Sequence, residues 1–284
     1  MAMTDSTDPT SGTTMVSALF PDAACAIADL RAMLSMSAGG LINLSKVSDT
    51  TLWNKLMAAE AEAERILKTF FGAVEVLPDN CDPSEIAAFE AAGTRYTLVS
   101  AFDYDPDLFR NDAWGYMRLP FAPIQQLHSV KIVFPAPFLQ DYTVPEDWIR
   151  LDSKYGDLQL VPTTTAPVTP VGAYAVAMWG GTVYPQAVQM RYRCGLTNAS
   201  GTVVTSFAQH WNDLVDVVQR MAIMKLLRMA FLPTSASISA DGLSQSKSFD
   251  YKVWQDGIDE VLKGGKGANG GLFVQIHGAM GLVG

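Results

Sequence analysis

The sequence is short of charge and of cysteine. Charged residues make up 17% of the 284 residues and the formal net charge is −9, so no global basic field would attract nucleic acid. This shortage of charge suggests that partners cover part of the surface; the alternative explanation is long loops or a large core. The three cysteines, Cys25, Cys81 and Cys194, are far apart and lack metal-ligand spacing, so we interpret them as reduced thiols.

Membrane and secretion signals are absent as well. The opening "MAMTDSTDPTSGTTM" lacks the basic start and apolar core of a signal peptide. No apolar run approaches the ~18 residues of a membrane span. We therefore expect a soluble protein, made in the cytoplasm and without a membrane partner.

Apolar residues at helical spacing predict helices near both ends of the chain. Ser48 or Asp49 is expected to cap the first confident helix and Gly72 to end it, while Gly264 ends the last one. The expected helices span residues 22–37, 50–71, 207–232 and 250–263.

Short β-like runs broken by proline and glycine occupy the middle of the chain. "DSKYGD" is a credible hairpin turn between two of them. The expected strands lie within residues 95–102, 129–135, 147–152, 157–162, 173–179 and 187–195.

These patterns predict an α+β fold: a helical bundle, made of the N-terminal helix and two C-terminal helices, with an inserted antiparallel β-rich domain and extended termini. The expected parts are a flexible N-terminal arm with a short helix (1–47), a helical core (48–72 and 206–263), a β-rich inserted domain (73–205) and a Gly-rich docking tail (264–284).

Three motifs resemble binding or catalytic sequences, and each lacks an essential part. "GKGANG" (265–270) spells the dinucleotide fingerprint but follows an expected helix and precedes an expected strand. "DYDPD" (103–107) begins like a calcium loop, but Leu108 and Trp114 replace the required glycine and glutamate. "GLSQS" (242–246) begins like a nucleophile elbow and lacks its final glycine.

The titratable residues show no catalytic spacing. His128, His210 and His277 are distant in sequence and have no ligand-like neighbours. Glu60 and Glu64 share one face of the first confident helix, which we interpret as a solvated face. We expect no enzymatic activity, no cofactor and no metal site.

The segment "SASISADGLSQSKSFD" (235–250) is the most distinctive stretch of the chain. Asp241-Gly242 flanked by alternating residues predicts a β-hairpin with a type I′ turn; the alternative is a Ser-rich linker. Because an isolated hairpin is only marginally stable, we expect a neighbouring subunit to supply its missing contacts.

The glycine-rich tail is expected to dock on a partner. "LFVQI" (272–276) would make a strand that adds to the edge of a partner's sheet. Deleting residues 264–284 should then leave a folded protein that no longer attaches to its partner. The candidate interface with other chains consists of Ile238, Asp241, Gly242, Leu243, Ser244, Leu272, Phe273, Val274 and Ile276.

Four stretches resemble the head–tail connector (adaptor or neck) proteins of tailed bacteriophages. They are "RLPFAPIQQLHSVKIVF" (118–134), "MRYRCGL" (190–196), "VVQRMAIMKLLRMAF" (217–231) and "ISADGLSQSKSF" (238–249). The order of parts is similar too: an N-terminal helix, a β-rich segment, a long apolar helix, a loop, a last helix and a tail.

The resemblance covers residues 50–72 and 115–263. The longer N-terminus, the insert around 78–112 and the proline-rich loop after 161 depart from it, which leaves the β topology open.

The resemblance implies a structural virion protein of the neck. Its copies would form a dodecameric ring on the portal protein, extend the DNA channel and present a surface to the next neck or tail protein. Viral DNA would pass through without sequence-specific binding. The alternative is another phage virion component with a β-rich module, such as a tail terminator, a minor capsid protein or a tail-fibre adaptor; an enzyme is a third reading.

Overall fold

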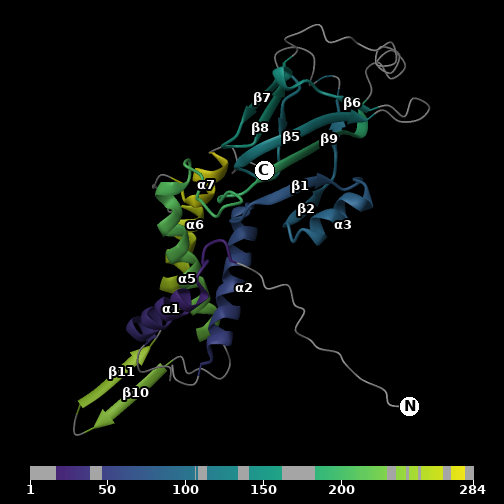
Figure 1. Ribbon diagram of the computed structural model, residues 1–284. Helices are drawn as coiled ribbons and strands as arrows, with labels where there is room; N and C mark the ends of the chain where they lie inside the picture. Colours follow the sequence, from purple (N-terminus) through teal and green to yellow (C-terminus); the bar gives the residue numbers. More distant parts are fainter. Residues whose placement is uncertain are drawn as a thin grey trace, which may run out of the picture.

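The computed structural model places a helical bundle and a β-rich domain at opposite ends of an elongated molecule (Figure 1). The structure describes residues 17–38, 47–105, 107, 114–133, 141–161, 183–228, 235–240, 243–248, 251–264 and 270–278, the two segments between 235 and 248 as backbone only. Each end has its own hydrophobic core. The α+β fold expected from the sequence is confirmed.

The helical end contains five α-helices and one 3₁₀ turn among the described residues. They are α1 (Ala23–Ala38), α2 (Asp49–Leu67), η5 (Ala208–His210), α5 (Trp211–Leu227), α6 (Tyr251–Lys263) and α7 (Leu272–His277). No helix within the described ranges has the length and apolar character needed to cross a membrane.

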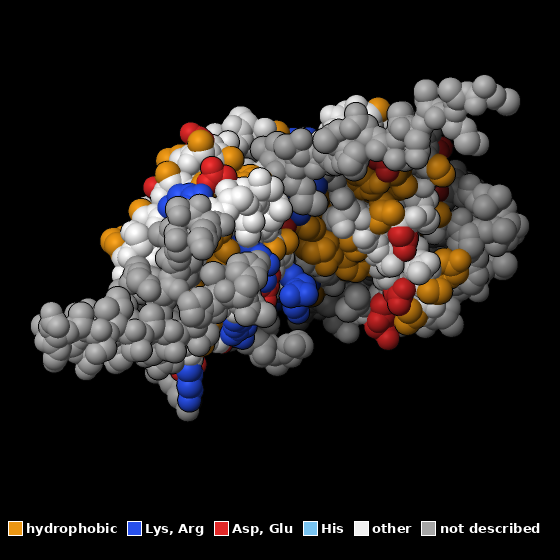
Figure 2. Space-filling view, turned by 90° about the horizontal axis from the view of Figure 1, so that it is seen from below, with side chains coloured by type: hydrophobic (Ala, Val, Ile, Leu, Met, Phe, Trp, Pro, Cys, Tyr) orange, Lys and Arg blue, Asp and Glu red, His pale blue; other side chains and the backbone are white. Residues whose placement is uncertain are grey.

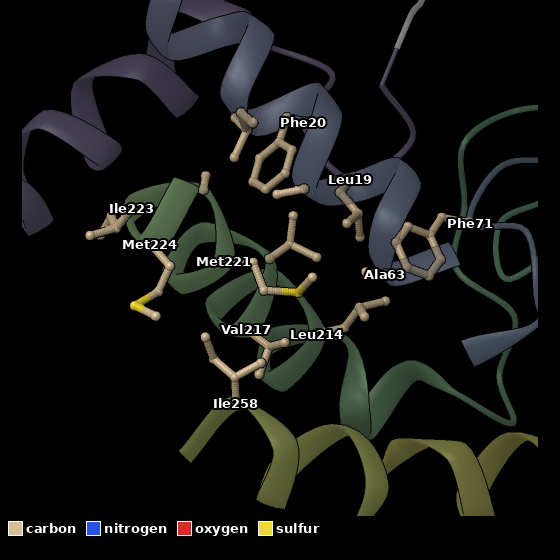
Figure 3. Close-up of a cluster of buried hydrophobic side chains, with 14 of the residues drawn as sticks. Leu19, Phe20, Ala63, Phe71, Leu214, Val217, Met221, Ile223, Met224 and Ile258 are labelled. Atoms are coloured by element: carbon tan, nitrogen blue, oxygen red, sulfur yellow. The ribbon is translucent and has the colours of Figure 1, made fainter. Parts of the chain in front are cut away.

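Helix α5 is the centre of the bundle. Its side chains Leu214 and Met221 point toward α2, while Val217 lies beside Ile258 of α6 on the opposite side (Figure 3). A helix covered on several sides must be apolar around most of its circumference, as the sequence of α5 is.

The two ends of α2 are set by local backbone chemistry. The side chain of Ser48 accepts a hydrogen bond from the Thr51 backbone N–H, as the sequence predicts for an N-cap. The helix ends earlier than expected, however. Lys68, and not Gly72, is the residue that ends it, by adopting the left-handed conformation (φ 49°).

Two sheets enclose the second core. The larger sheet has the strand order β2-β1-β9-β5-β6 with β3 also paired to β9, and the smaller sheet has the order β4-β8-β7. All pairings are antiparallel except that of β1 with β2. The elements are β1 (Val74–Pro78), α3 (Pro83–Ala91), β2 (Tyr96–Val99), β3 (Phe102–Tyr104), β4 (Met117–Arg118), β5 (Ile124–Val133), β6 (Asp141–Thr143), η4 (Glu146–Trp148), β7 (Ile149–Asp152), β8 (Asp157–Leu160) and β9 (Tyr184–Cys194).

Strand β9 shows how the sequence pattern fits this domain. Met190, Tyr192 and Cys194 face the core, while Arg191 and Arg193 between them face the other side of the sheet. The hairpin turn predicted at "DSKYGD" joins β7 and β8, with Asp152 opposite Asp157 and Gly156 at φ 75°. The strand expected at 173–179 lies outside the described residues.

The two ends meet where the chain leaves α2 and where it returns from β9. The Leu196 and Thr197 backbone N–H groups donate to the carbonyls of Phe70 and Phe71. Gly195 (φ 131°) passes so close to Gly72 that a Cβ would overlap the Gly72 carbonyl oxygen. The glycine in "MRYRCGL" is therefore required by this crossing.

Candidate functional site

The serine-rich segment forms the predicted hairpin. Strand β10 (Ser235–Ala240) pairs antiparallel with β11 (Leu243–Ser248), and the register places Ala240 opposite Leu243. Among the described strands, neither pairs with any other strand. The hairpin projects beyond the end of the bundle that is far from the β-rich domain (Figure 1). The turn residues Asp241 and Gly242 lie outside the described residues.

The register divides the hairpin into two unlike faces. Residues directly opposite each other, and residues two apart along one strand, share a face. One face therefore consists of serine positions alone, namely Ser235, Ser237, Ser239, Ser244, Ser246 and Ser248. The other face consists of Ala236, Ile238, Ala240, Leu243, Gln245 and Lys247.

The strand expected in the C-terminal tail is wrong: Leu272–His277 is the helix α7. Leu272 and Ile276 are buried in the helical core, and Phe273 and Val274 are half-buried. A short apolar run shows neither helical nor strand periodicity clearly. The surface on which it packs therefore determines whether it becomes a helix or a strand. Here α7 packs on α6 and α2 of its own chain.

Helix α7 also bridges the two ends of the molecule. A ring nitrogen of His277 lies 2.6 Å from the Leu67 carbonyl oxygen at the end of α2, while the His277 carbonyl accepts a hydrogen bond from Arg118 of β4. Gly278 then lies against the ring of Tyr155 in the β7–β8 turn. Burial lowers the pKa of His277 below its usual value, so the ring is neutral at pH 7.

The solvated-face interpretation of Glu60 and Glu64 is wrong. Glu60 is only 7% exposed and accepts hydrogen bonds from the Ser17 hydroxyl (2.5 Å) and the Ala18 backbone N–H (3.2 Å). Burial raises the pKa of Glu60, an effect that the Ser17 hydrogen bond opposes. The sequence offered no signal for this contact, since residue 17 comes from a segment distant in sequence.

Glu64 is a carboxylate of α2 that connects the helical end to the β-rich end. Arg95 donates to both of its oxygens, at 3.1 and 2.7 Å, and the Phe71 backbone N–H donates to the first at 2.8 Å. A bidentate arginine–carboxylate pair fixes orientation as well as distance. Glu64 therefore holds the strand region beside β2 against the end of α2.

Two more arginine–carboxylate pairs lie on the side of the large sheet that faces away from its core. Arg191 binds Glu85 of α3 at 2.6 and 2.7 Å. Arg193 binds Glu75, whose other oxygen is 3.0 Å from the ring of His128. The first pair holds α3 to β9, and both pairs are interpreted as structural.

Two carboxylates of the calcium-like motif accept hydrogen bonds from backbone N–H groups. The Asp103 carboxylate accepts from the Gln186 backbone N–H and that of Asp105 from the Asp107 backbone N–H. In the part of the chain that is described, no group of three His, Cys, Asp or Glu side chains is placed to hold a metal ion. Residues 265–269 of the glycine motif lie outside that part.

One open cleft of ≈ 760 Å³ lies over the outward face of the small sheet. Tyr116, which is 36% exposed, stands at its side and donates to the Asp157 carboxylate at 2.7 Å. Nothing in the sequence pattern predicts this cleft. The residues that line it are Tyr116, Arg150, Leu151, Asp152, Ser153, Lys154, Asp157 and Gln159.

Hydrophobic side chains are also exposed on the surface seen from below, between small groups of basic and of acidic side chains (Figure 2). The large hydrophobic residues with the greatest exposure among those described are Met36, Val253, Val183, Trp114, Leu98 and Tyr116. Apolar surface of this kind is typical of proteins that bind other proteins, although isolated exposed residues are common.

No protein-family model and no curated protein matches the chain. It is similar to a chain in the neck of an empty gene transfer agent (GTA) particle computed with C6 symmetry, with 17% identity, a TM-score of 0.38, and coverage of 81% of this chain and 88% of that one. It is also similar to a chain in the virion of a native GTA particle, with 17% identity, a TM-score of 0.36, and coverage of 76% and 83%. Scores this low do not establish a common fold.

Proposed function

We propose that this chain is a structural virion protein whose copies form a ring at the neck of a phage-like particle. The ring joins the portal to the tail or to the next neck protein and extends the DNA channel. The observation that carries the proposal is the β10–β11 hairpin, which pairs with no other described strand of its own chain and projects beyond the bundle. Because a two-stranded hairpin is marginal by itself, another chain is needed to cover it.

The structure also gives a physical reason for one of the stretches that resemble connector proteins. Gly195 of "MRYRCGL" lies where the chain returns from the β-rich domain to the bundle, against Gly72. Such a crossing belongs to a helical bundle interrupted by a β-rich insert, the order of parts on which the resemblance rests.

The charge of the chain suits a channel through which DNA passes. At a net charge of −9, the assembled protein would not hold phosphate groups as a basic lumen would. A lumen lined mainly by Lys and Arg in the assembled ring would contradict this part of the proposal.

The proposal is tested by electron microscopy and mass measurement of the purified full chain, alone and mixed with portal rings. We expect closed rings around a channel wide enough for duplex DNA, seated on the portal. A trimer would support a tail-fibre adaptor instead, and a protein that stays monomeric in the presence of portal would overturn the proposal.

A further inference from the structure

Helix α1 exposes a face that is nearly free of charge. Its inward side packs on the bundle through Ala26, Leu30 and Leu34. The side chains that are exposed are Ala23, Ala24, Cys25, Ala28, Asp29, Ala32, Ser35 and Met36. Only one of these is charged, and Met36 is 76% exposed, the highest value among the large hydrophobic residues described.

The one other charge on this helix points away from that face. Arg31 binds the Asp49 carboxylate at 2.6 Å and the Val47 carbonyl at 2.8 Å, at the beginning of α2. The outward face of α1, which we define as Cys25, Ala28, Asp29, Ala32, Ser35 and Met36, therefore presents small and apolar side chains with a single carboxylate.

The hairpin has a complementary face at the same end of the molecule. Its non-serine face carries apolar residues at Ala236, Ile238, Ala240 and Leu243 and one basic residue, Lys247, the only charged residue in either strand. Both α1 and the hairpin lie at the end of the bundle far from the β-rich domain (Figure 1). Each face thus combines apolar residues with a single charge, and the two charges are opposite.

We propose that the outward face of α1 receives the non-serine face of the β10–β11 hairpin from a second copy of this chain, with Asp29 of one copy facing Lys247 of the next. The small side chains on α1 let the strands approach the helix closely. Since the two faces are different patches, the contact is head-to-tail and repeats from copy to copy, which closes into a ring when the rotation allows. This inference rests on the proposed function and names the contact between ring subunits.

Disulfide trapping tests the contact directly, because Cys25 already lies on the outward face of α1. The full chain carries Cys81→Ser to remove the half-buried thiol, together with Ala240→Cys on the non-serine face or, as the matched control, Ser239→Cys on the serine face. Mild oxidation should convert the Ala240→Cys protein into a ladder of dimers, trimers and higher species on a non-reducing gel. The Ser239→Cys protein should give about tenfold less of these, since adjacent positions in a strand face opposite ways.

Three outcomes would overturn the proposal. The first two are equal ladders from both variants and no species larger than a monomer from either. The third is a disulfide that the Ala240→Cys protein forms inside one chain, between Cys25 and the introduced thiol, which would mean that the hairpin covers its own α1.

A charge exchange tests the Asp29–Lys247 pairing. Asp29→Lys and Lys247→Asp should each weaken self-association about tenfold, and the double variant should recover to within about twofold, because it restores opposite charges across the contact. Ala58→Lys on an exposed position of α2 is the matched control and should have no effect. A double variant as weak as either single one would exclude the pairing.

Failure of the α1–hairpin contact can be distinguished from failure of the proposed function. If the Ala240→Cys protein forms rings on the portal without a disulfide to Cys25 of the next copy, the function stands and this contact is overturned. A disulfide ladder from a protein that never forms rings with portal would keep the contact and overturn the function.

Discussion

The β10–β11 hairpin and helix α7 lie near each other in the chain, and the sequence suggests that each awaits a partner. The structure separates them. Helix α7 buries Leu272 and Ile276 in the helical core of its own chain, whereas the hairpin pairs with no other described strand and projects from the bundle. An apolar stretch can thus complete the fold or serve assembly, and only its surroundings determine which.

Truncation should show the largest difference between the two segments. Deleting residues 271–284 removes two buried aliphatic side chains, each contributing about 2–5 kcal/mol, and the hydrogen bonds of His277. We expect a loss on the order of 5 kcal/mol in the free energy of unfolding, enough to unfold many domains. This prediction replaces the expectation that a chain without its tail stays folded. Thermal denaturation of the truncated chain measures the loss of stability.

The matched deletion removes the hairpin. Ser235 and Ser248 are directly opposite each other, so Gly-Gly can replace residues 236–247 without moving the ends. The unfolding free energy should change by less than about 0.5 kcal/mol while ring formation is lost. A strongly destabilised protein would show that the hairpin belongs to the folded core.

Single substitutions sharpen the same comparison at a smaller scale. Ile276→Ala should cost about 2–4 kcal/mol, because the side chain is 3% exposed. Ile238→Ala should leave the unfolding free energy of the isolated chain unchanged within about 0.5 kcal/mol and weaken self-association. Chemical denaturation measures the unfolding free energy of each variant, and sedimentation measures its self-association. If both substitutions lowered the unfolding free energy equally, the hairpin would belong to the folded core as α7 does.

The smallest expected effect is on the pH dependence of stability. The pKa of His277 is lowered by burial, so below the usual value of 6.5 the unfolded chain takes up a proton that the folded chain does not. This group therefore makes stability fall as the pH drops from about 7 toward 5. The pKa of Glu60 is raised by burial, so the folded chain takes up this proton before the unfolded chain does. Glu60 therefore makes stability rise as the pH falls further toward its usual value.

His277→Gln separates the two contributions, since glutamine can still donate to the Leu67 carbonyl but does not titrate. The difference between the wild-type and variant curves of melting temperature against pH should shrink as the pH falls, the wild type losing stability faster. Parallel curves would mean that the pKa of His277 is the same in the folded and unfolded states.

Much of the fold follows from local patterns. The stripes of α2, α5 and α6, the β7–β8 turn and the Asp241-Gly242 hairpin were all predictable from spacing. Helix α3 was missed although its signal is present: Asp82 caps it by accepting from the Ser84 backbone N–H, and Pro83 follows at the first helical position. Strand β1 was missed as well, because its five residues are all buried and show no alternation.

The contacts between elements that are distant in the sequence were beyond local patterns. Ser17 meets Glu60, Arg95 meets Glu64 and Arg118 meets the carbonyl of His277, each across a long stretch of chain. Spacing within one element says nothing about which charged residue of another element will lie opposite.

By itself, the sequence determined that α2, α5, α6 and the β7–β8 turn form, because capping groups, glycines and apolar periods act within a few residues. It also determined that the serine segment is a hairpin, since Asp-Gly and the alternation around it are local. The tertiary structure alone decided that α7 is a helix covered by its own chain and that Glu60 is buried. Those outcomes depend on which surfaces meet, and surfaces from distant segments exist only once the chain has folded.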